Sequence, residues 1–579
     1  MVSSVRYSGD TLTAAFLSME IGIDAAMPTY AGGLGVLAGD VIRAAADIEL
    51  PMAGVSLLHR KGYFRQHLDS CGNQTESPAE WSPEQLLELL PVRVMITLAN
   101  QQIQVQAWRY LVHSESGFTV PVYFLDTNLA ENPPWVRSLT DYLYGADAHY
   151  RLCQEVVLGF GGLTLLRAIG HKKVRAFHMN EGHSAFTSLA LLEERLWGRG
   201  LSTATAADKE AVRQHCVFTT HTPLLAGHDG FPLHLVREVL GEERTNFLLT
   251  TQCCTDGGLS MTRLALDFSR YVNGVSMRHE EVSQTLFVNH RINAVTNGVH
   301  ATTWTSPSFK QIYDRYIPEW RRDNLYLRYA IRIPVEEIWH AHQEAKKELL
   351  QLVERRTGRR LDPGLLTIGF ARRAAAYKRS DLLFRDVNRL REVVKKAGGI
   401  QIIYGGKAHP TDEPGKDLIR RVFQAAAELG NDIPVVYLEE YDLSLAKYLC
   451  AGVDLWLNTP QKPHEASGTS GMKAALNGVP SLSVLDGWWI EGHIEAVTGW
   501  AVGDGWRTET DLQTEVTSLY DKLEFEILPL YYRNPDDFAG IMRSAIAMNG
   551  SYFNAQRMIV QYLQNAYIPA GSPHPAYPG

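Results

Sequence analysis

The sequence predicts an α/β protein built on two doubly wound parallel sheets, and three observations support this class. Short apolar runs alternate with helix-like segments along the chain, an order typical of parallel sheets. The chain has 579 residues, too many for a single hydrophobic core, so two or more domains are expected. Most of the apolar runs also end in polar or cationic residues, which is where such sheets bind ligands.

The first half, residues 1–300, is expected to form an N-terminal α/β domain. Its apolar runs predict strands at 50–59, 174–180, 216–222 and 292–298. The join to the second domain is expected near 300–335, a region that three prolines interrupt. These prolines are Pro307, Pro318 and Pro334.

The second half, residues 301–579, is expected to form a C-terminal α/β domain whose last helix packs back on the first. After Ser380, apolar residues spaced for one helix face follow at Leu383, Val387, Leu390 and Val394. The Pro- and Gly-rich tail 567–579 is predicted to be irregular. The predicted strands are 365–371, 400–406, 434–441, 453–459 and 480–487.

The composition is that of an ordinary globular protein and argues against several classes of function. The net charge is −8, which offers no reason to expect a nucleic-acid partner. No apolar run approaches the roughly 18 residues of a membrane span, and the first residues do not resemble a signal peptide. The six cysteines are sparse and form no CxxC pair. A reducing, cytoplasmic setting is therefore expected.

Hydrogen-bonding and cationic side chains gather at the ends of the predicted strands. Two domains that face each other would join these ends in one polar cleft, which suits a sugar or a phosphate better than a lipid. The residues concerned are Asn180, Glu181, His183, Thr220, His221, Asn297, Arg372, Arg373, Lys407, Glu440, Tyr441, Asn458 and Asp486.

Two segments have the character of anion-binding loops. "GFARRAAAYKRSD" (369–381) places Arg372, Arg373, Lys378 and Arg379 between a strand and a helix, where guanidinium groups match phosphate geometry. A solvated basic loop remains the alternative. "TYAGGLGVLAGD" (29–40) offers glycine amides before a helix but lacks the GK[ST] of a P-loop. A glycine turn without a ligand is the alternative here.

The stretch "EASGTSGMKAALNGVP" (465–480) holds one lysine, Lys473, behind a run of small residues. A lysine can form an imine with an aldehyde cofactor such as pyridoxal phosphate, and small neighbours leave room for it. The alternative is a loop that caps the next helix and leaves Lys473 in solvent. "NEGH" and "TTHTP" supply His183 and His221 without HExxH spacing, so no metal centre is expected.

Seven stretches together resemble the α-glucan phosphorylase family of glycogen, starch and maltodextrin phosphorylases. They follow the family's order, cover most of the chain from about 15 to 490, and are most similar to the short bacterial and archaeal members. The stretches are "YAGGLGVLAGD", "TTHTP", "VTNGVH", "FARRAAAYKR", "IYGGKAHP", "VVYLEEYDLSLA" and "EASGTSGMKAALNG".

The resemblance implies two Rossmann-like domains that face a cleft, the GT-B architecture. It implies retaining phosphorolysis of the non-reducing end of an α-1,4-glucan such as glycogen or maltodextrin, with α-glucose 1-phosphate as product. Inorganic phosphate is then the second substrate, and pyridoxal 5'-phosphate is the cofactor that helps to move the proton. A homodimer is expected from the family. The regulatory N-terminal extension of the long members has no evident counterpart, so we expect no control by serine phosphorylation.

The family motifs also assign roles to single residues. Lys473 matches the lysine that holds the cofactor, and Tyr441 matches a tyrosine near the cofactor's phosphate. Arg372 and Thr469 are expected to contact that phosphate, with Ser470, Gly471, Gly32 and Gly33 close by. Arg373, Lys378 and the Gly33 amide are expected to bind the substrate phosphate. The transferred glucose is expected to contact His221, Asn297, Glu465, Ala466, Ser467 and Gly468.

At some positions this chain differs from the long animal-type members, and these differences bear on its affinity for the cofactor and on its reaction rate. Ser470 and Gly471 stand where those enzymes have Gly and Asn, Ala31 replaces an Asn, and Gly22 replaces an aromatic residue. Two other functions stay open. One is a glucosyltransferase of the same fold that uses a sugar nucleotide, as glycogen synthases do. The other is a glucan-binding or regulatory protein with weakened catalysis.

Overall fold

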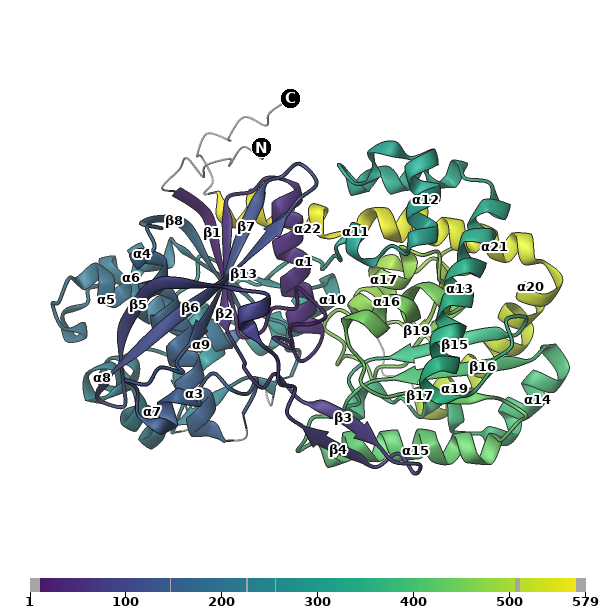
Figure 1. Ribbon diagram of the computed structural model, residues 1–579, viewed down its shortest axis with the longest axis horizontal. Coiled ribbons are helices and arrows are strands. Elements are labelled where there is room, and N and C mark those ends of the chain that lie inside the picture. The colour runs from purple at the N-terminus through teal and green to yellow at the C-terminus, as the bar shows by residue number, and fades with distance from the viewer. Residues whose placement is uncertain (1–10, 146, 225–226, 256, 506–510, 569–579) are drawn as a thin grey trace.

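The protein has two lobes, each built around one sheet (Figure 1). The structure is a computed structural model that describes residues 11–145, 147–224, 227–255, 257–505 and 511–568. The α/β class is confirmed by the parallel strand pairs and covering helices of both sheets. Of the predicted irregular tail, residues 569–579 lie outside the described residues. No described helix combines the length and apolar character that a membrane span requires.

The first sheet has nine strands in the order β14-β13-β9-β8-β1-β2-β7-β6-β5. Neighbours run parallel from β14 to β7, whereas β6 is antiparallel to both β7 and β5. The prediction of a purely parallel sheet is therefore wrong at this edge. A two-residue turn at Ala99 and Asn100, both with positive φ, joins β5 to β6 and permits only antiparallel pairing. The strands are β1 (Thr11–Ser18), β2 (Met52–Leu57), β5 (Glu88–Leu98), β6 (Gln101–His113), β7 (Thr119–Asp126), β8 (Lys173–Asn180), β9 (Cys216–Thr219), β13 (Tyr271–Gly274) and β14 (Asn293–Ala294).

Helices cover both faces of this sheet, because alternate residues of a strand point to opposite faces. Ala14 and Phe16 of β1 belong to a core with α1 (Gly33–Asp47) and α22 (Ala555–Tyr562). Ala15 and Leu17 belong to the opposite core, which holds the next group of helices. These are α3 (Ala148–Val156), the π-helical η2 (Val157–Gly161), α4 (Gly162–Ala168), α5 (Phe186–Leu196) and α9 (Met261–Asp267).

The second sheet is parallel throughout, in the order β17-β16-β15-β18-β19-β20. The strand order reverses between β15 and β18, which makes this point the expected ligand position. The five strands predicted in the second half are confirmed, and β20 is an addition. The strands are β15 (Leu366–Ala371), β16 (Ile400–Gly405), β17 (Val435–Leu438), β18 (Leu455–Asn458), β19 (Ser481–Val484) and β20 (Gly499–Val502).

Helices also cover both faces of the second sheet. One face packs on α13 (Val335–Thr357) and α16 (Leu443–Gly452), the other on α14 (Val387–Ala397) and α19 (Leu512–Asp521). The helix predicted after Ser380 starts later than expected, since a 3-10 turn (Leu382–Phe384) precedes α14. That turn carries Leu383, which is buried nonetheless.

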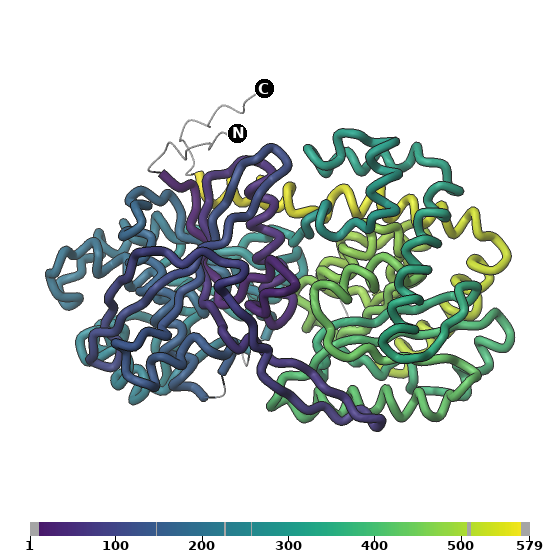
Figure 2. Tube along the Cα trace, viewed as in Figure 1, coloured from purple at the N-terminus to yellow at the C-terminus, as the bar shows by residue number. Residues whose placement is uncertain are grey.

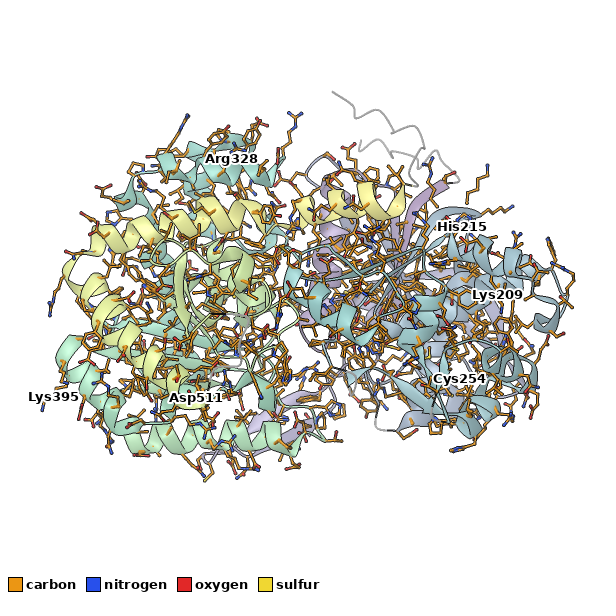
Figure 3. The ribbon with its side chains drawn as sticks, turned by 180° about the vertical axis from the view of Figure 1, so that it is seen from behind. Lys209, His215, Cys254, Arg328, Lys395 and Asp511 are labelled. Atoms are coloured by element: carbon orange, nitrogen blue, oxygen red, sulfur yellow. The ribbon has the colours of Figure 1, made fainter. Side chains whose placement is uncertain are left out.

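Two segments cross between the lobes. The hairpin of β3 (Arg65–Leu68) and β4 (Gln74–Ser77) leaves the first lobe and reaches α15 (Glu413–Leu429) in the second (Figure 2). The C-terminal helices run back from α21 (Pro535–Ser544) to α22, which packs on α1. From behind, this last segment passes from the lobe of Arg328, Lys395 and Asp511 to that of Lys209, His215 and Cys254 (Figure 3).

Candidate active site

The predicted site residues follow the carboxyl ends of strands in both lobes. Arg372 and Arg373 directly follow β15, and the loop 459–468 follows β18, at the point where the second sheet reverses its order. In the first lobe, Glu181 follows β8 and His221 lies just beyond β9. This placement is the one that the general rule for open α/β sheets predicts for a ligand site.

The carboxylate of Glu465 is the centre of the basic cluster. Lys378 Nζ donates to its two oxygens at 2.8 and 2.6 Å, and Arg372 Nη2 donates at 2.8 Å. Burial alone would raise the pKa of Glu465, but these cations hold it below its ordinary value. Arg372 Nε and Nη1 are buried and have no partner among the described residues. Arg372 therefore retains donors for a further anion.

The glycine loop faces Arg373 across the two lobes. A Cβ added to Gly32 would lie 3.6 Å from Arg373 Nη2, and one added to Gly33 would meet no atom within 4 Å. Glu20 accepts hydrogen bonds from the amides of Ala31 and Gly32, at 2.6 and 3.2 Å. The Gly32 amide thus has a partner within the chain, and the space next to Gly33 leaves that backbone accessible.

Lys473 lies in α17 (Thr469–Ala475) and is only 6% exposed. The alternative that placed this lysine in solvent is therefore wrong. Its Nζ lies 3.9 Å from the centroid of the Trp304 ring, which comes from α11 (Ala301–Trp304). Burial lowers the pKa of Lys473, with nearby Asp40 acting in the opposite direction. A lysine with a lowered pKa is a better nucleophile toward an aldehyde than one in water.

Packing explains part of the small-residue run before Lys473. A Cβ on Gly471 would lie 2.6 Å from Trp488 Cζ2, and Gly468 has φ +93°, which favours glycine. Ser470 Oγ accepts from Trp456 Nε1 at 3.2 Å. Trp488 and Trp489, whose aromatic rings could in principle stack on a sugar, are both buried. These two rings therefore belong to the core.

The sugar-binding candidates carry buried polar atoms that lack partners. Asn297 Oδ1 and Ser467 Oγ have no hydrogen-bond partner among the described residues. Ser276 Oγ donates to the carbonyl of Ala466 at 2.7 Å, while the Asn297 amide donates to the neighbouring Val275 carbonyl at 3.0 Å. This bridge from the first lobe to the second connects the two sets of candidates. Unpaired buried acceptors and hydroxyls suit a ligand rich in hydroxyl groups.

His221 is held in one orientation by two residues at the end of β8. Its Nε2 lies 2.7 Å from Asn180 Oδ1, and its amide donates to Glu181 Oε2 at 2.7 Å. Because an amide oxygen only accepts, Nε2 carries the proton. Burial lowers the pKa of His221 to about 4, so the ring is neutral near pH 7.

The remaining predicted residues lie in the second lobe. Thr469 is the first residue of α17. Tyr441 lies beside β16, because a Cβ on Gly405 would be 3.4 Å from its ring. The charge of Arg372 lowers the pKa of Tyr441, whereas burial, the larger effect, raises it. Among the described residues, no group of three or more His, Cys, Asp or Glu is arranged to hold a metal ion.

Sequence reasoning assigned no specific role to two residues that shape this region, Glu20 and Asp486. Glu20 accepts from Tyr144 Oη at 2.8 Å as well as from the glycine loop. Asp486 Oδ2 accepts from the Glu465 amide at 2.9 Å. The position of Asp486 at a strand end was a usable signal. Glu20 follows β1, a strand that the apolar pattern did not predict, so it gave no comparable signal.

Comparisons with known proteins agree with this site. The carbohydrate phosphorylase family matches residues 241–509, which include Arg372, Lys378 and Lys473. The chain is 39% identical to the maltodextrin phosphorylase of Thermococcus litoralis, over 96% of this chain and 70% of that protein. It is 36% identical to the glycogen phosphorylase of Aquifex aeolicus, over 95% and 85%. It is 34% identical to that of Mycobacterium tuberculosis, over 96% and 71%. The chain belongs to the carbohydrate phosphorylase family.

Proposed function

We propose that this protein is an α-glucan phosphorylase that transfers the non-reducing-end glucose of an α-1,4-glucan to inorganic phosphate. The observation that carries this proposal is a buried lysine, Lys473, in the same lobe as the basic cluster in which Arg372 and Lys378 both donate to the Glu465 carboxylate. Relatives named maltodextrin and glycogen phosphorylase support the same activity. A sugar-nucleotide transferase would need no buried lysine of this kind.

The residues around Lys473 fit pyridoxal 5'-phosphate as the cofactor. The amine is buried and has a lowered pKa, which suits covalent attachment to an aldehyde. The two unpartnered nitrogens of Arg372 offer charged donors to the cofactor's phosphate, with Thr469 and Tyr441 as further candidates. When bound, the cofactor supplies a phosphate that can exchange a proton with the substrate phosphate near neutral pH.

Arg373, Lys378 and the Gly33 amide are proposed to bind the substrate phosphate. Two phosphate groups side by side repel each other strongly, so the site needs several cations and N–H donors. Lys378 now donates to Glu465, and a phosphate dianion would compete with that carboxylate for it. Arg373 is solvent-exposed and faces the glycine loop, so it is free to meet a phosphate from that side.

In the proposed reaction, the bond between C1 and the leaving glucan oxygen breaks, and a phosphate oxygen forms the new bond to C1 on the same face. The leaving oxygen takes a proton from the substrate phosphate. Asn297, Ser467 and Glu465 are proposed to bind the hydroxyls of the transferred glucose. The neutral His221 and its main-chain carbonyl would stabilise the positive charge that develops at the sugar. No carboxylate nucleophile is required, unlike in glycosidases that use two acids.

At the level of architecture, we propose that the two sheets are the cores of two Rossmann-like domains in a GT-B arrangement, divided near residue 300. The strand order of the second sheet supports this assignment. We further propose a cytoplasmic homodimer, since the described cysteines are all free and the family commonly pairs. Light scattering across a range of concentrations measures the oligomeric state.

The test of function is the release of glucose 1-phosphate from glycogen and from maltodextrins, with inorganic phosphate and no sugar nucleotide. We expect release from at least one of these glucans. Lys473→Ala should abolish it and also remove the near-ultraviolet absorbance of bound cofactor. Lys447→Ala serves as the matched control, because Lys447 is an exposed lysine of the same lobe, on α16.

Two outcomes would contradict the proposal. Full phosphorolysis by Lys473→Ala without added cofactor would exclude the role of this lysine. Transfer from a sugar nucleotide by folded protein that ignores phosphate would favour the glycogen synthase-like alternative instead.

A further inference from the structure

The loop that carries Asn297 is held by α22, the last α-helix among the described residues. Arg557 in α22 donates from Nη1 to the Thr296 carbonyl at 2.5 Å and from Nη2 to the Asn297 carbonyl at 2.9 Å. A planar guanidinium that binds two successive carbonyls fixes the orientation of the peptide between them. The Asn297 side chain, whose Oδ1 has no described partner, projects from this peptide unit.

The guanidinium is itself held rigidly. Its Nε donates to the Tyr552 carbonyl at 2.9 Å, and Nη1 also donates to Gln561 Oε1 at 3.0 Å. The Tyr552 ring lies 4.9 Å from the centre of the group. The hydrogen-bond partners of Arg557 are therefore oxygens of neutral groups, and all three of its nitrogens are in use. The group is anchored on α22 and reaches out to the Asn297 loop.

The backbone around this contact is fitted to α22 as well. Val299 exchanges hydrogen bonds with the start of the helix: its amide donates to Phe553 at 3.0 Å, and its carbonyl accepts from Ala555 at 2.9 Å. A Cβ on Gly298 would lie 2.1 Å from the Asn554 carbonyl oxygen, so only glycine fits. On the other side, Glu491 Oε2 accepts from Thr296 Oγ1 at 2.7 Å. The loop is thus clamped between α22 and the second lobe.

We propose that Arg557 is a positioning residue of the active site, which aims the side chain of Asn297 at the transferred glucose. The inference rests on the proposed function, because it takes Asn297 to be a sugar-binding residue. Its physical basis is that an error of about 1 Å in the position of a binding group can cost about 100-fold in rate. The C-terminal helix would then complete the site, although about 260 residues separate Arg557 from Asn297.

The experiment compares phosphorolysis by wild type, Arg557→Met, Arg557→Lys, Asn297→Ala and the double variant of Arg557→Met with Asn297→Ala. We expect Arg557→Met to lower kcat/KM for glucan by about 100-fold. Arg557→Lys should lose less, since one ammonium can still bind one carbonyl. If Arg557 acts through Asn297, the double variant should be no slower than the worse single variant.

Two controls separate positioning from general destabilisation. Arg543→Met removes a comparable arginine from the C-terminal segment, one that donates to the Ile333 carbonyl at 3.1 Å, outside the proposed site. It should keep wild-type kinetics. Millimolar guanidinium chloride should restore activity to Arg557→Ala and leave Arg543→Met unchanged, which a purely structural defect would not do.

Wild-type kinetics in Arg557→Met would overturn the inference and leave the proposed function intact. The same holds if the loss of kcat/KM in the double variant equals the product of the losses in the two single variants. Failure of guanidinium to rescue folded Arg557→Ala would also overturn it. A wild-type protein that releases no glucose 1-phosphate would refute the proposed function, and this inference with it.

Discussion

Asp486 shows how one residue can hold a binding loop. Its Oδ2 accepts from the Glu465 amide and its Oδ1 from the Gly487 amide, both at 2.9 Å. Gly487 has φ +57°, and a Cβ there would lie 2.4 Å from the Ser467 carbonyl oxygen. The turn after β19 is therefore fitted closely to the loop proposed to bind glucose, and Asp486 is its main polar link.

The ionisation of Asp486 makes a pH dependence testable. Burial raises its pKa to about 7, and Glu465 adds to the shift, whereas Arg278 opposes it and Lys462 lies close enough to interact. Between the ordinary value of 3.8 and about 7, the folded protein holds more protons at this site than the unfolded chain. The contribution of Asp486 to stability therefore falls as pH rises through this window, by up to about 1.4 kcal/mol per pH unit.

Asp486→Asn removes this titration, so the difference in unfolding free energy between wild type and variant should shrink from pH 4.5 to pH 7. Denaturant unfolding at several pH values measures it. Glu80→Gln, which alters an exposed carboxyl, is the control. A difference that stays constant with pH would contradict the assigned pKa.

At the scale of elements, the hairpin of β3 and β4 joins the lobes next to the basic cluster. Gln66 is 2% exposed, and its Nε2 donates to the Gly406 carbonyl and to Gln74 Oε1, each at 2.9 Å. Its Oε1 accepts from the Glu440 amide at 3.0 Å. Gly406 follows β16 and packs on the Arg372 carbonyl, with φ +147°. The hairpin therefore supports the backbone that positions Arg372.

Gln66→Ala should weaken this link by about 1–3 kcal/mol, because the partly buried Glu440 amide loses its partner. We expect faster proteolysis at the hairpin turn 69–73 and a reduced rate of phosphorolysis. Limited proteolysis followed by mass spectrometry locates the cleavage. Gln102→Ala removes an exposed hydrogen bond from β6 to Thr97 on β5 and should change neither quantity. Unchanged cleavage in Gln66→Ala would show that the hairpin is held by its other contacts.

At the scale of the whole molecule, α22 completes the core of the first lobe. Its Met558, Ile559 and Tyr562 share a buried cluster with α1 and β1. A domain cut at residue 300 would expose that apolar face to water, and burying it contributes about 25 cal/mol per Å².

We therefore expect residues 1–300 alone to be aggregation-prone. The same fragment fused through a flexible linker to residues 551–568 should be more soluble and should bind less of a hydrophobic dye. Soluble yield and dye fluorescence measure the effect. A matched fusion that carries charged residues in place of Met558 and Ile559 should give no improvement. Equal solubility of all three would contradict a structural role for the returning helix.

Local sequence pattern was enough to predict the α/β class and the nine predicted strands, because both depend on residues that are neighbours in the sequence. A run such as 400–406 is apolar over its whole length, as a strand buried on both faces must be. The motif around Lys473 likewise lies within a few residues.

What lay beyond the sequence depends on contacts between distant residues. Only the tertiary structure showed the antiparallel edge of the first sheet and the burial of Lys473 against Trp304. It also showed that Arg372 and Lys378 both donate hydrogen bonds to Glu465. The hydrogen bond from Arg557 to the Asn297 carbonyl likewise became visible only in the folded protein. Apolar periodicity reports which face of an element is buried but not what that face packs against. The sequence alone therefore predicted the fold class, many of the strands and the candidate site segments. Only tertiary packing decided which charges meet and which polar atoms remain for a ligand.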